Sequence, residues 1–123
     1  MQVHDAEFDA AVQAALDALP EAFRARLENV VIEIHDRPAE RILREPGATP
    51  EMLGFYIGVP LTERSLEAGE PLLPARILLF RDNLRRIAAS REELIREIRI
   101  TLLHEIGHHF GLDEDDLAAL GYD

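Results

Sequence analysis

The sequence predicts one α+β domain that spans residues 1–123. Apolar residues recur with a helical period near both ends of the chain, over residues 8–19 and 91–110. Between them lie three short apolar runs rich in β-branched and aromatic residues, at 30–34, 53–59 and 76–81. We therefore expect N-terminal helices, a small mixed sheet of about three strands, and a C-terminal helix packed on that sheet.

The N-terminal third of the chain predicts two helices followed by a strand. An amphipathic helix begins near Asp5 and ends before Pro20, which cannot continue it. Pro20 also suits the first turn of a short second helix that extends to Leu27. The run Val30–Ile34 is typical of a buried strand, because its residues are mostly β-branched.

Two long segments with prolines and glycines predict loops between the strands. Pro38–Glu51 is the first, with one helical turn expected at Ala39–Leu43, and Leu61–Pro74 is the second. The strand at Leu53–Val59 contains glycines, which permit a bend or the close approach of another backbone. A further helical turn is expected at Asp82–Ile87.

The last predicted helix has clear signals for both of its ends. Ser90 and Glu93 have the spacing of a capping box, in which the two side chains satisfy backbone N–H groups at a helix start. Apolar residues then recur every three or four positions as far as Phe110. Gly111 is suited to end the helix, because glycine adopts the left-handed conformation at low cost. The helix is therefore expected over about Arg91–Phe110.

Within this helix, His104, Glu105 and His108 form the pattern HExxH. Residues four apart lie one turn apart on the same helical face, so the two imidazoles can converge on one ion. Zn²⁺ suits such a site, because imidazole and carboxylate ligands leave a fourth position for water. Glu105 is then placed to act as a general base toward that water. The alternative is a helix with two surface histidines and an accidental glutamate.

The third metal ligand is predicted just beyond the helix. The spacing HExxHxxGxxE continues the pattern from His104 through Gly111 to Glu114, so the chain turns at the glycine and returns a carboxylate. Asp113 is an alternative ligand, and the acidic run around it also has the spacing to cap a following helix or to remain solvated. His35, at the end of a predicted strand, is a further alternative.

Composition argues against several classes of protein. A net charge of −11 is unsuited to binding nucleic acid or anionic membrane surfaces, which attract basic patches. The absence of cysteine excludes disulfide bonds and sulfur ligation of a metal. The N-terminus lacks the features of a signal peptide, and no apolar run has membrane-spanning length. A cytoplasmic location is therefore expected.

Residues Asn29 to Leu117 resemble the minimal zincin-like metallopeptidase family of short bacterial proteins. The pieces that carry this resemblance are Val30–Pro38, Gly58–Ser65, Leu73–Arg81 and Arg99–Leu112. Only the HExxHxxG piece is highly specific. The resemblance implies a zincin-like fold and a zinc peptidase. The family usually has Asp at the position of Glu114, so this chain keeps the carboxylate and adds one methylene.

The sequence thus predicts a zinc metallopeptidase in which His104, His108 and Glu114 bind Zn²⁺ and Glu105 is the catalytic base. The candidates for a second donor to the oxyanion are Tyr56, His109 and Tyr122.

The expected substrate is a peptide or an unfolded protein. It would add as a strand to an exposed sheet edge, at Leu53–Val59 or at Arg76–Phe80. Two rival hypotheses are a zinc-binding regulatory protein of the same fold without peptidase activity, and an interaction domain that binds no metal.

Overall fold

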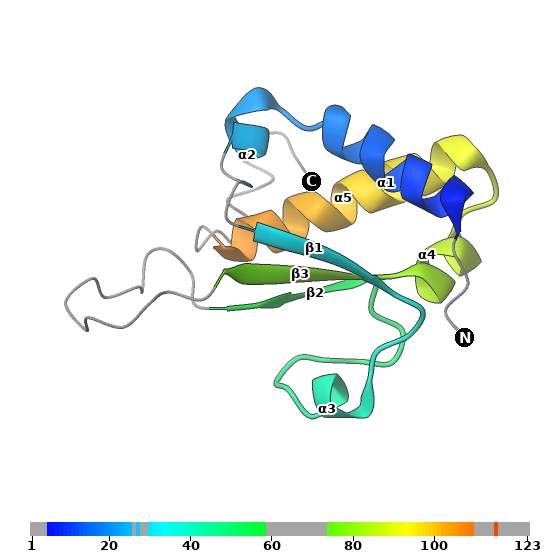
Figure 1. Ribbon diagram of the computed structural model, residues 1–123. Coiled ribbons are helices and arrows are strands. Elements are labelled where there is room, and N and C mark those ends of the chain that lie inside the picture. Colours follow the sequence, from blue (N-terminus) through cyan, green and yellow to red (C-terminus); the bar gives the residue numbers. More distant parts are fainter. Residues whose placement is uncertain (1–4, 26, 28–29, 59–73, 110–114, 116–123) are drawn as a thin grey trace.

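The computed structural model describes residues 5–25, 27, 30–58, 74–109 and 115. The helices in this part of the chain are α1 (Ala6–Asp17), α2 (Glu21–Ala25), α3 (Glu40–Leu43), α4 (Arg81–Ile87) and α5 (Arg91–His109). The strands are β1 (Val30–His35), β2 (Gly54–Ile57) and β3 (Ala75–Phe80). Helices α1 and α5 cover one face of the sheet, and α3 lies on the other (Figure 1). The predicted α+β class is confirmed.

Strand β3 lies at the centre of the sheet, whose order is β1-β3-β2. It pairs in parallel with β1, from Val30 opposite Ala75 to His35 opposite Phe80. It pairs antiparallel with β2, in which Gly54 lies opposite Leu79. The sheet is therefore mixed, as predicted. Because β3 is paired on both sides, the expectation that Arg76–Phe80 could form a substrate edge is wrong, whereas β2 is an end strand of the described sheet.

Alternating residues of β3 supply two separate apolar layers, because successive side chains of a strand point to opposite faces. Ile77 and Leu79 pack into the core formed with α1 and α5. Leu78 and Phe80 pack on the other side against Ile42 of α3. The fully buried residues of α5 are Ile98, Leu102 and Ile106. Their spacing of four confirms the predicted apolar stripe, which fixes the rotation of α5 about its axis.

The boundaries of several elements differ slightly from the predicted ones, among them α1, α4 and α5. Helix α1 begins at Ala6, directly after Asp5, and ends at Asp17, short of Pro20. Arg81 begins α4 and does not end the preceding strand, because Phe80 is the last extended residue. Helix α5 covers Arg91–His109, and Phe110 lies outside the described residues. None of the helices in the described part has the length and apolar composition of a membrane span.

The start of α5 is capped by the two residues that predicted it. The Ser90 hydroxyl accepts a hydrogen bond from the Glu93 amide at 3.1 Å. The Glu93 carboxylate accepts one from the backbone amide of Ala89 at 2.8 Å, one residue before the Ser90 amide of a regular capping box. The cap therefore fixes where α5 begins. The apolar stripe of α5 determines which residues near its other end face the sheet.

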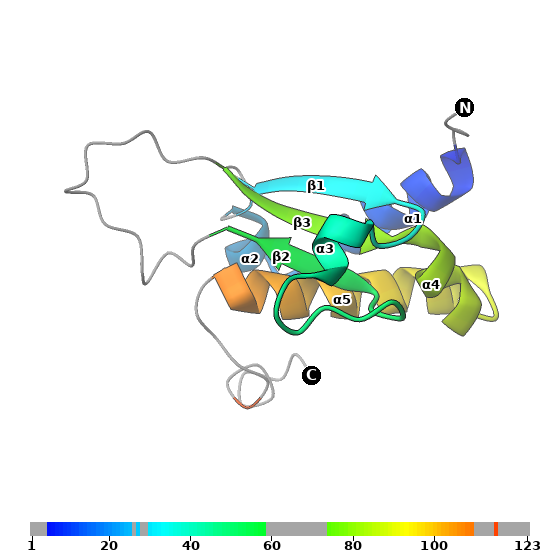
Figure 2. The same ribbon diagram turned by 90° about the horizontal axis from the view of Figure 1, so that it is seen from below.

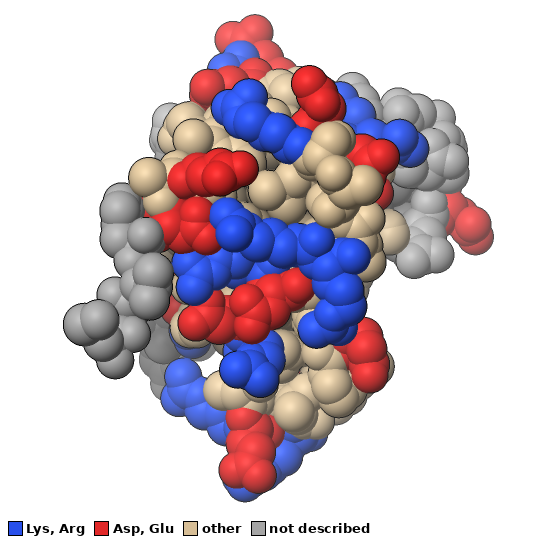
Figure 3. Space-filling view, turned by 90° about the vertical axis from the view of Figure 1, so that its right-hand side faces the viewer, with Lys and Arg blue, Asp and Glu red and all other residues tan. Residues whose placement is uncertain are grey.

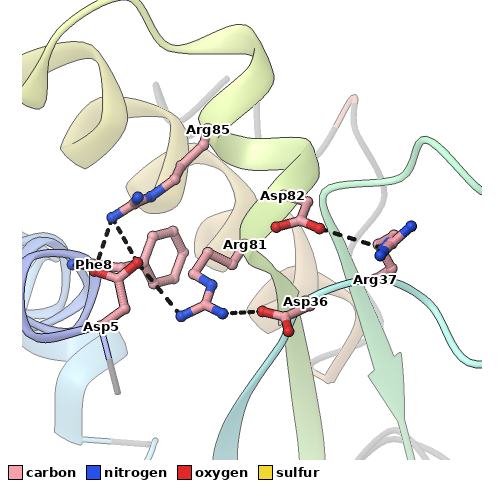
Figure 4. Close-up of polar contacts among 7 residues, drawn as sticks. All are labelled: Asp5, Phe8, Asp36, Arg37, Arg81, Asp82 and Arg85. Carbon is pink, nitrogen blue, oxygen red and sulfur yellow. Dashed lines mark hydrogen bonds and ion pairs between the residues drawn. The ribbon is translucent and has the colours of Figure 1, made fainter. Parts of the chain in front are cut away.

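Asp5 joins the start of α1 to α4. Its carboxylate accepts a hydrogen bond from the Phe8 amide at 3.0 Å and another from Arg85 at 2.8 Å. Arg81 lies between Asp5 and Asp36 and forms ion pairs with both (Figure 4). The Arg85 guanidinium also lies 5.8 Å from the centre of the Phe8 ring, within range of a cation–π interaction. One carboxylate thus acts as helix cap and as anchor to two arginines.

Arginines at this end of the molecule lie among acidic side chains (Figure 3). A further pair there joins the Nε atom of Arg37 to an Oδ atom of Asp82 at 3.4 Å. Both partners are exposed, so this pair contributes about 1 kcal/mol or less. Positive charge on this face is therefore locally compensated by carboxylates.

Glu33 of β1 forms an ion pair with Arg76 of β3 across the parallel pairing. The Arg76 Nη2 atom donates to a Glu33 carboxylate oxygen at 3.0 Å, and the Arg76 Nε atom donates to the other oxygen. The Nε2 atom of His35 lies 3.0 Å from the same carboxylate. The hydrogen bonds from Arg76 first, and then from His35, lower the pKa of Glu33 from 4.5 to about 2.

We expect Glu33→Gln to reduce stability in a pH-dependent way. The folded-state pKa of Glu33 lies below the unfolded value, so its contribution is fully present above about 4.5 and is lost as the pH falls toward about 2. The variant should be less stable at pH 7 by about 1 kcal/mol, since both partners are partly exposed. Urea unfolding at pH 7 and near pH 3 measures the difference. Glu92→Gln, at an exposed position of α5, is the control, and an equal loss for Glu33→Gln at both pH values would contradict the assignment.

Candidate metal centre

Helix α5 brings three of the predicted site residues to one cleft. His104 and His108 lie one turn apart on the same helical face, and Glu105 follows His104. His104 and Glu105 are partly buried, whereas His108 is exposed. All three line the same cleft, so the helix places two imidazoles and a carboxylate around a shared space.

The cleft has a volume of about 560 Å³ and lies between β2 and α5. Figure 2 shows α5 running along the sheet beside β2. The other residues that line the cleft are Pro46, Gly47, Met52, Leu53, Gly54, Phe55, Tyr56, Ile100 and Thr101. Polar histidine and glutamate side chains therefore lie at one part of the cleft, and mostly apolar side chains line the remainder.

The environment of Glu105 changes its acidity. Burial disfavours the charged carboxylate and raises the pKa of Glu105 from 4.5 to about 7. A hydrogen bond with the Tyr56 backbone opposes this rise, because it stabilises the carboxylate. A carboxyl group with a pKa near neutrality is well matched to accepting and donating protons at neutral pH.

The donor set of the cleft fits zinc as far as it is described. Two imidazoles four residues apart on a helix are common zinc ligands, and a nearby carboxyl group suits the chemistry of such a site. Within the described residues, no group of three or more His, Cys, Asp or Glu side chains is arranged to hold a metal ion. Glu114 and its alternative Asp113 lie outside the described residues. The prediction of the third ligand therefore stays a prediction.

The remaining candidates lie in different places. Tyr56 lines the cleft, so it stays a candidate oxyanion donor. His109 is the last residue of α5, and Tyr122 lies outside the described residues. His35 lies within β1 and contacts Glu33, and it is not among the residues that line the cleft. The alternative in which His35 is a metal ligand therefore finds no support.

A buried asparagine positions the cleft wall and was not anticipated from the sequence. Asn83 of α4 is 3% exposed, and its side-chain amide donates to the carbonyl oxygens of Pro50 and Met52 at 2.8 Å each. These bonds tie the segment before β2, including Met52 of the cleft, to α4. No local pattern indicates this role, because a polar residue in a short amphipathic helix is ordinarily exposed.

Comparison with known proteins identifies relatives of the chain. The family model described as zincin-like metallopeptidase matches residues 27–122. A solved structure of a conserved hypothetical protein from Thermo thermophilus is similar, with 25% sequence identity and a TM-score of 0.53. The similarity covers 94% of this chain and 96% of that one. A search of curated proteins gives no significant match.

Proposed function

Since this chain belongs to the zincin-like metallopeptidase family, we propose that it hydrolyses peptide bonds with the help of a bound zinc ion. The observation that carries the proposal is the placing of His104, Glu105 and His108 around one cleft beside the end strand β2. In this proposal His104, His108 and Glu114 hold Zn²⁺, and Glu105 is the general base. Glu114 lies outside the described residues and is included for its spacing in the HExxHxxGxxE pattern and for the acidic residue that the family usually has there.

The zinc ion, when bound, supplies a Lewis acid that activates water and polarises the carbonyl group of the substrate. Glu105 takes a proton from the attacking water and delivers it to the leaving amine. In the metal-free protein, burial raises the pKa of this carboxyl group to about 7. The hydrogen bond from the Tyr56 backbone restrains the Glu105 carboxylate, and both residues line the cleft.

The proposed substrate is a peptide or an unfolded protein segment in extended conformation. In the described sheet β2 pairs only with β3, so a peptide can pair with the backbone groups on the other side of β2, apart from the Tyr56 group that is hydrogen-bonded to Glu105. Apolar side chains of Met52, Phe55 and Ile100 line the same cleft as Glu105. Main-chain pairing would then supply much of the binding, with little dependence on substrate sequence.

Metal analysis combined with a peptide assay tests this proposal. Protein purified without added metal should contain about one zinc ion per chain and should hydrolyse an unstructured peptide. A chelator should abolish hydrolysis, and added Zn²⁺ should restore it. Bound zinc without hydrolysis would contradict the peptidase and favour the zinc-binding regulatory protein. Failure to bind zinc would contradict both.

A further inference from the structure

Strand β2 lies close to helix α5 at Gly54. A Cβ atom at this position would lie 2.6 Å from the Thr101 Cγ2 atom and 3.0 Å from the Leu78 carbonyl oxygen. Such separations are well below normal van der Waals contact of about 3.5–4.0 Å. The φ angle of Gly54 is not positive, unlike those of Gly47 and Gly58. Glycine is therefore required at position 54 for space and not for its backbone conformation.

The methyl group of Thr101 is held in place on the helix side of this contact. Thr101 is 6% exposed, and its hydroxyl donates to the Glu97 carbonyl oxygen at 2.8 Å. This bond selects the side-chain rotamer, because a β-branched residue in a helix has few alternatives. The Cγ2 methyl is consequently directed at β2, where only a glycine leaves room for it.

The contact lies next to the carboxylate of Glu105. Thr101 is one helical turn before Glu105, and a Cβ atom at Gly54 would lie 3.6 Å from the Glu105 Cγ atom. Tyr56, two residues after Gly54, supplies the backbone hydrogen bond to the same carboxylate. Gly54, Thr101 and the hydrogen bond between Tyr56 and Glu105 therefore lie in one region of contact between β2 and α5.

We infer that Gly54 and Thr101 are positioning residues, which set the distance between β2 and α5 at which the Glu105 carboxylate contacts the Tyr56 backbone. The inference rests on the proposed role of Glu105 as the base, because only then does this distance affect catalysis. The same contact also fixes the carboxylate relative to the strand along which the substrate is proposed to lie.

A rescue experiment with matched substitutions tests this inference. Gly54→Ala introduces the clashing atom. Thr101→Ser removes only the methyl group and keeps the hydroxyl, whereas Thr101→Val keeps that methyl and loses the hydroxyl. The proteins compared are wild type, Thr101→Ser, Gly54→Ala, and Gly54→Ala combined with either Thr101→Ser or Thr101→Val. Hydrogen exchange of the Tyr56 amide in metal-free protein, measured by NMR, reports the contact, and the Ile98 amide is the reference for global stability.

In Gly54→Ala, exchange at Tyr56 should accelerate roughly tenfold relative to Ile98, which corresponds to the loss of about one hydrogen bond. Adding Thr101→Ser should restore part of the protection, because it removes the contact with the Thr101 methyl group and leaves the contact with the Leu78 carbonyl oxygen. Adding Thr101→Val should restore none of it. In zinc-loaded protein, kcat should fall and recover in the same pattern, with zinc content unchanged.

Unchanged Tyr56 exchange in Gly54→Ala, or equal behaviour of the two double variants, would overturn the inference. If Gly54→Ala does not fold, the inference is supported when the double variant with Thr101→Ser folds and the double variant with Thr101→Val does not. It is contradicted when neither double variant folds. The exchange measurement needs neither metal nor turnover. An inactive wild-type protein would therefore refute the proposed peptidase activity, and the hydrogen-exchange results would still test the role of Gly54 and Thr101.

Discussion

Glu105→Gln is expected to lower kcat/KM for an unstructured peptide by roughly 10²–10⁴-fold, the range that a positioned general base contributes. Glutamine has nearly the shape of glutamate and can still accept a hydrogen bond from the Tyr56 backbone, but it cannot take a proton from water at neutral pH. The two imidazoles of His104 and His108 remain, so the zinc content should match that of wild type. Peptide hydrolysis and metal analysis on the same preparation measure the two effects together.

Glu92→Gln is the matched control for this substitution. It makes the same chemical change on the same helix at an exposed position in the first turn, far from the cleft. Its activity and zinc content should both equal those of wild type. Retained turnover in Glu105→Gln would remove Glu105 from the role of base, and loss of zinc would show that its carboxylate supports the metal site.

Helix α5 could be predicted because its signals are local. The Ser90 cap and the apolar spacing that continues through Ile98, Leu102 and Ile106 are read within a single stretch of chain. The structure places the helix at Arg91–His109, within one residue of the expected range. Because the same periodicity sets the buried face, the grouping of His104, Glu105 and His108 in one cleft follows from sequence spacing.

The order of the strands could not be predicted, because it depends on contacts between distant segments. The runs at β2 and β3 are similarly short and apolar, and neither shows which one is central. The parallel pairing of β1 with β3 brings Glu33 to Arg76, 43 residues away in sequence. Periodicity identifies a strand but does not identify its neighbours, so the sequence leaves two candidate segments for the substrate edge. The structure excludes Arg76–Phe80, because β3 is paired on both sides.

The contacts that form the walls of the cleft could not be predicted from the sequence either. The glycines of β2 were expected to permit close approach of another backbone, and at Gly54 the neighbour is the side chain of Thr101 together with the Leu78 carbonyl. The Glu105 carboxylate is hydrogen-bonded to the backbone of Tyr56, and a hydrogen bond from a backbone group cannot be predicted from residue types. Sequence spacing thus locates the reactive side chains, while tertiary packing determines their environment.

His104→Ala and His108→Ala are each expected to weaken zinc binding by more than roughly 100-fold. Loss of a residue that only hydrogen-bonds to a metal ligand already weakens binding by up to about 100-fold. Each substitution removes one of the two helical imidazoles, and a single imidazole with one carboxylate is a poor zinc site. Competition with a chromophoric chelator measures the affinity, and peptide hydrolysis should fall in parallel.

The two histidines differ in exposure, so substitution of the exposed one tests metal binding with little effect on the stability of the fold. His108 is exposed, so His108→Ala should leave the stability of the metal-free protein within about 0.5 kcal/mol of wild type while zinc binding is lost. His35→Ala is the matched control, because His35 contacts Glu33 in the sheet and does not line the cleft. Zinc binding should survive in His35→Ala. Loss of zinc there, or wild-type affinity in His108→Ala, would mean that the ion is bound by a different set of residues and that the cleft beside β2 is not the metal centre.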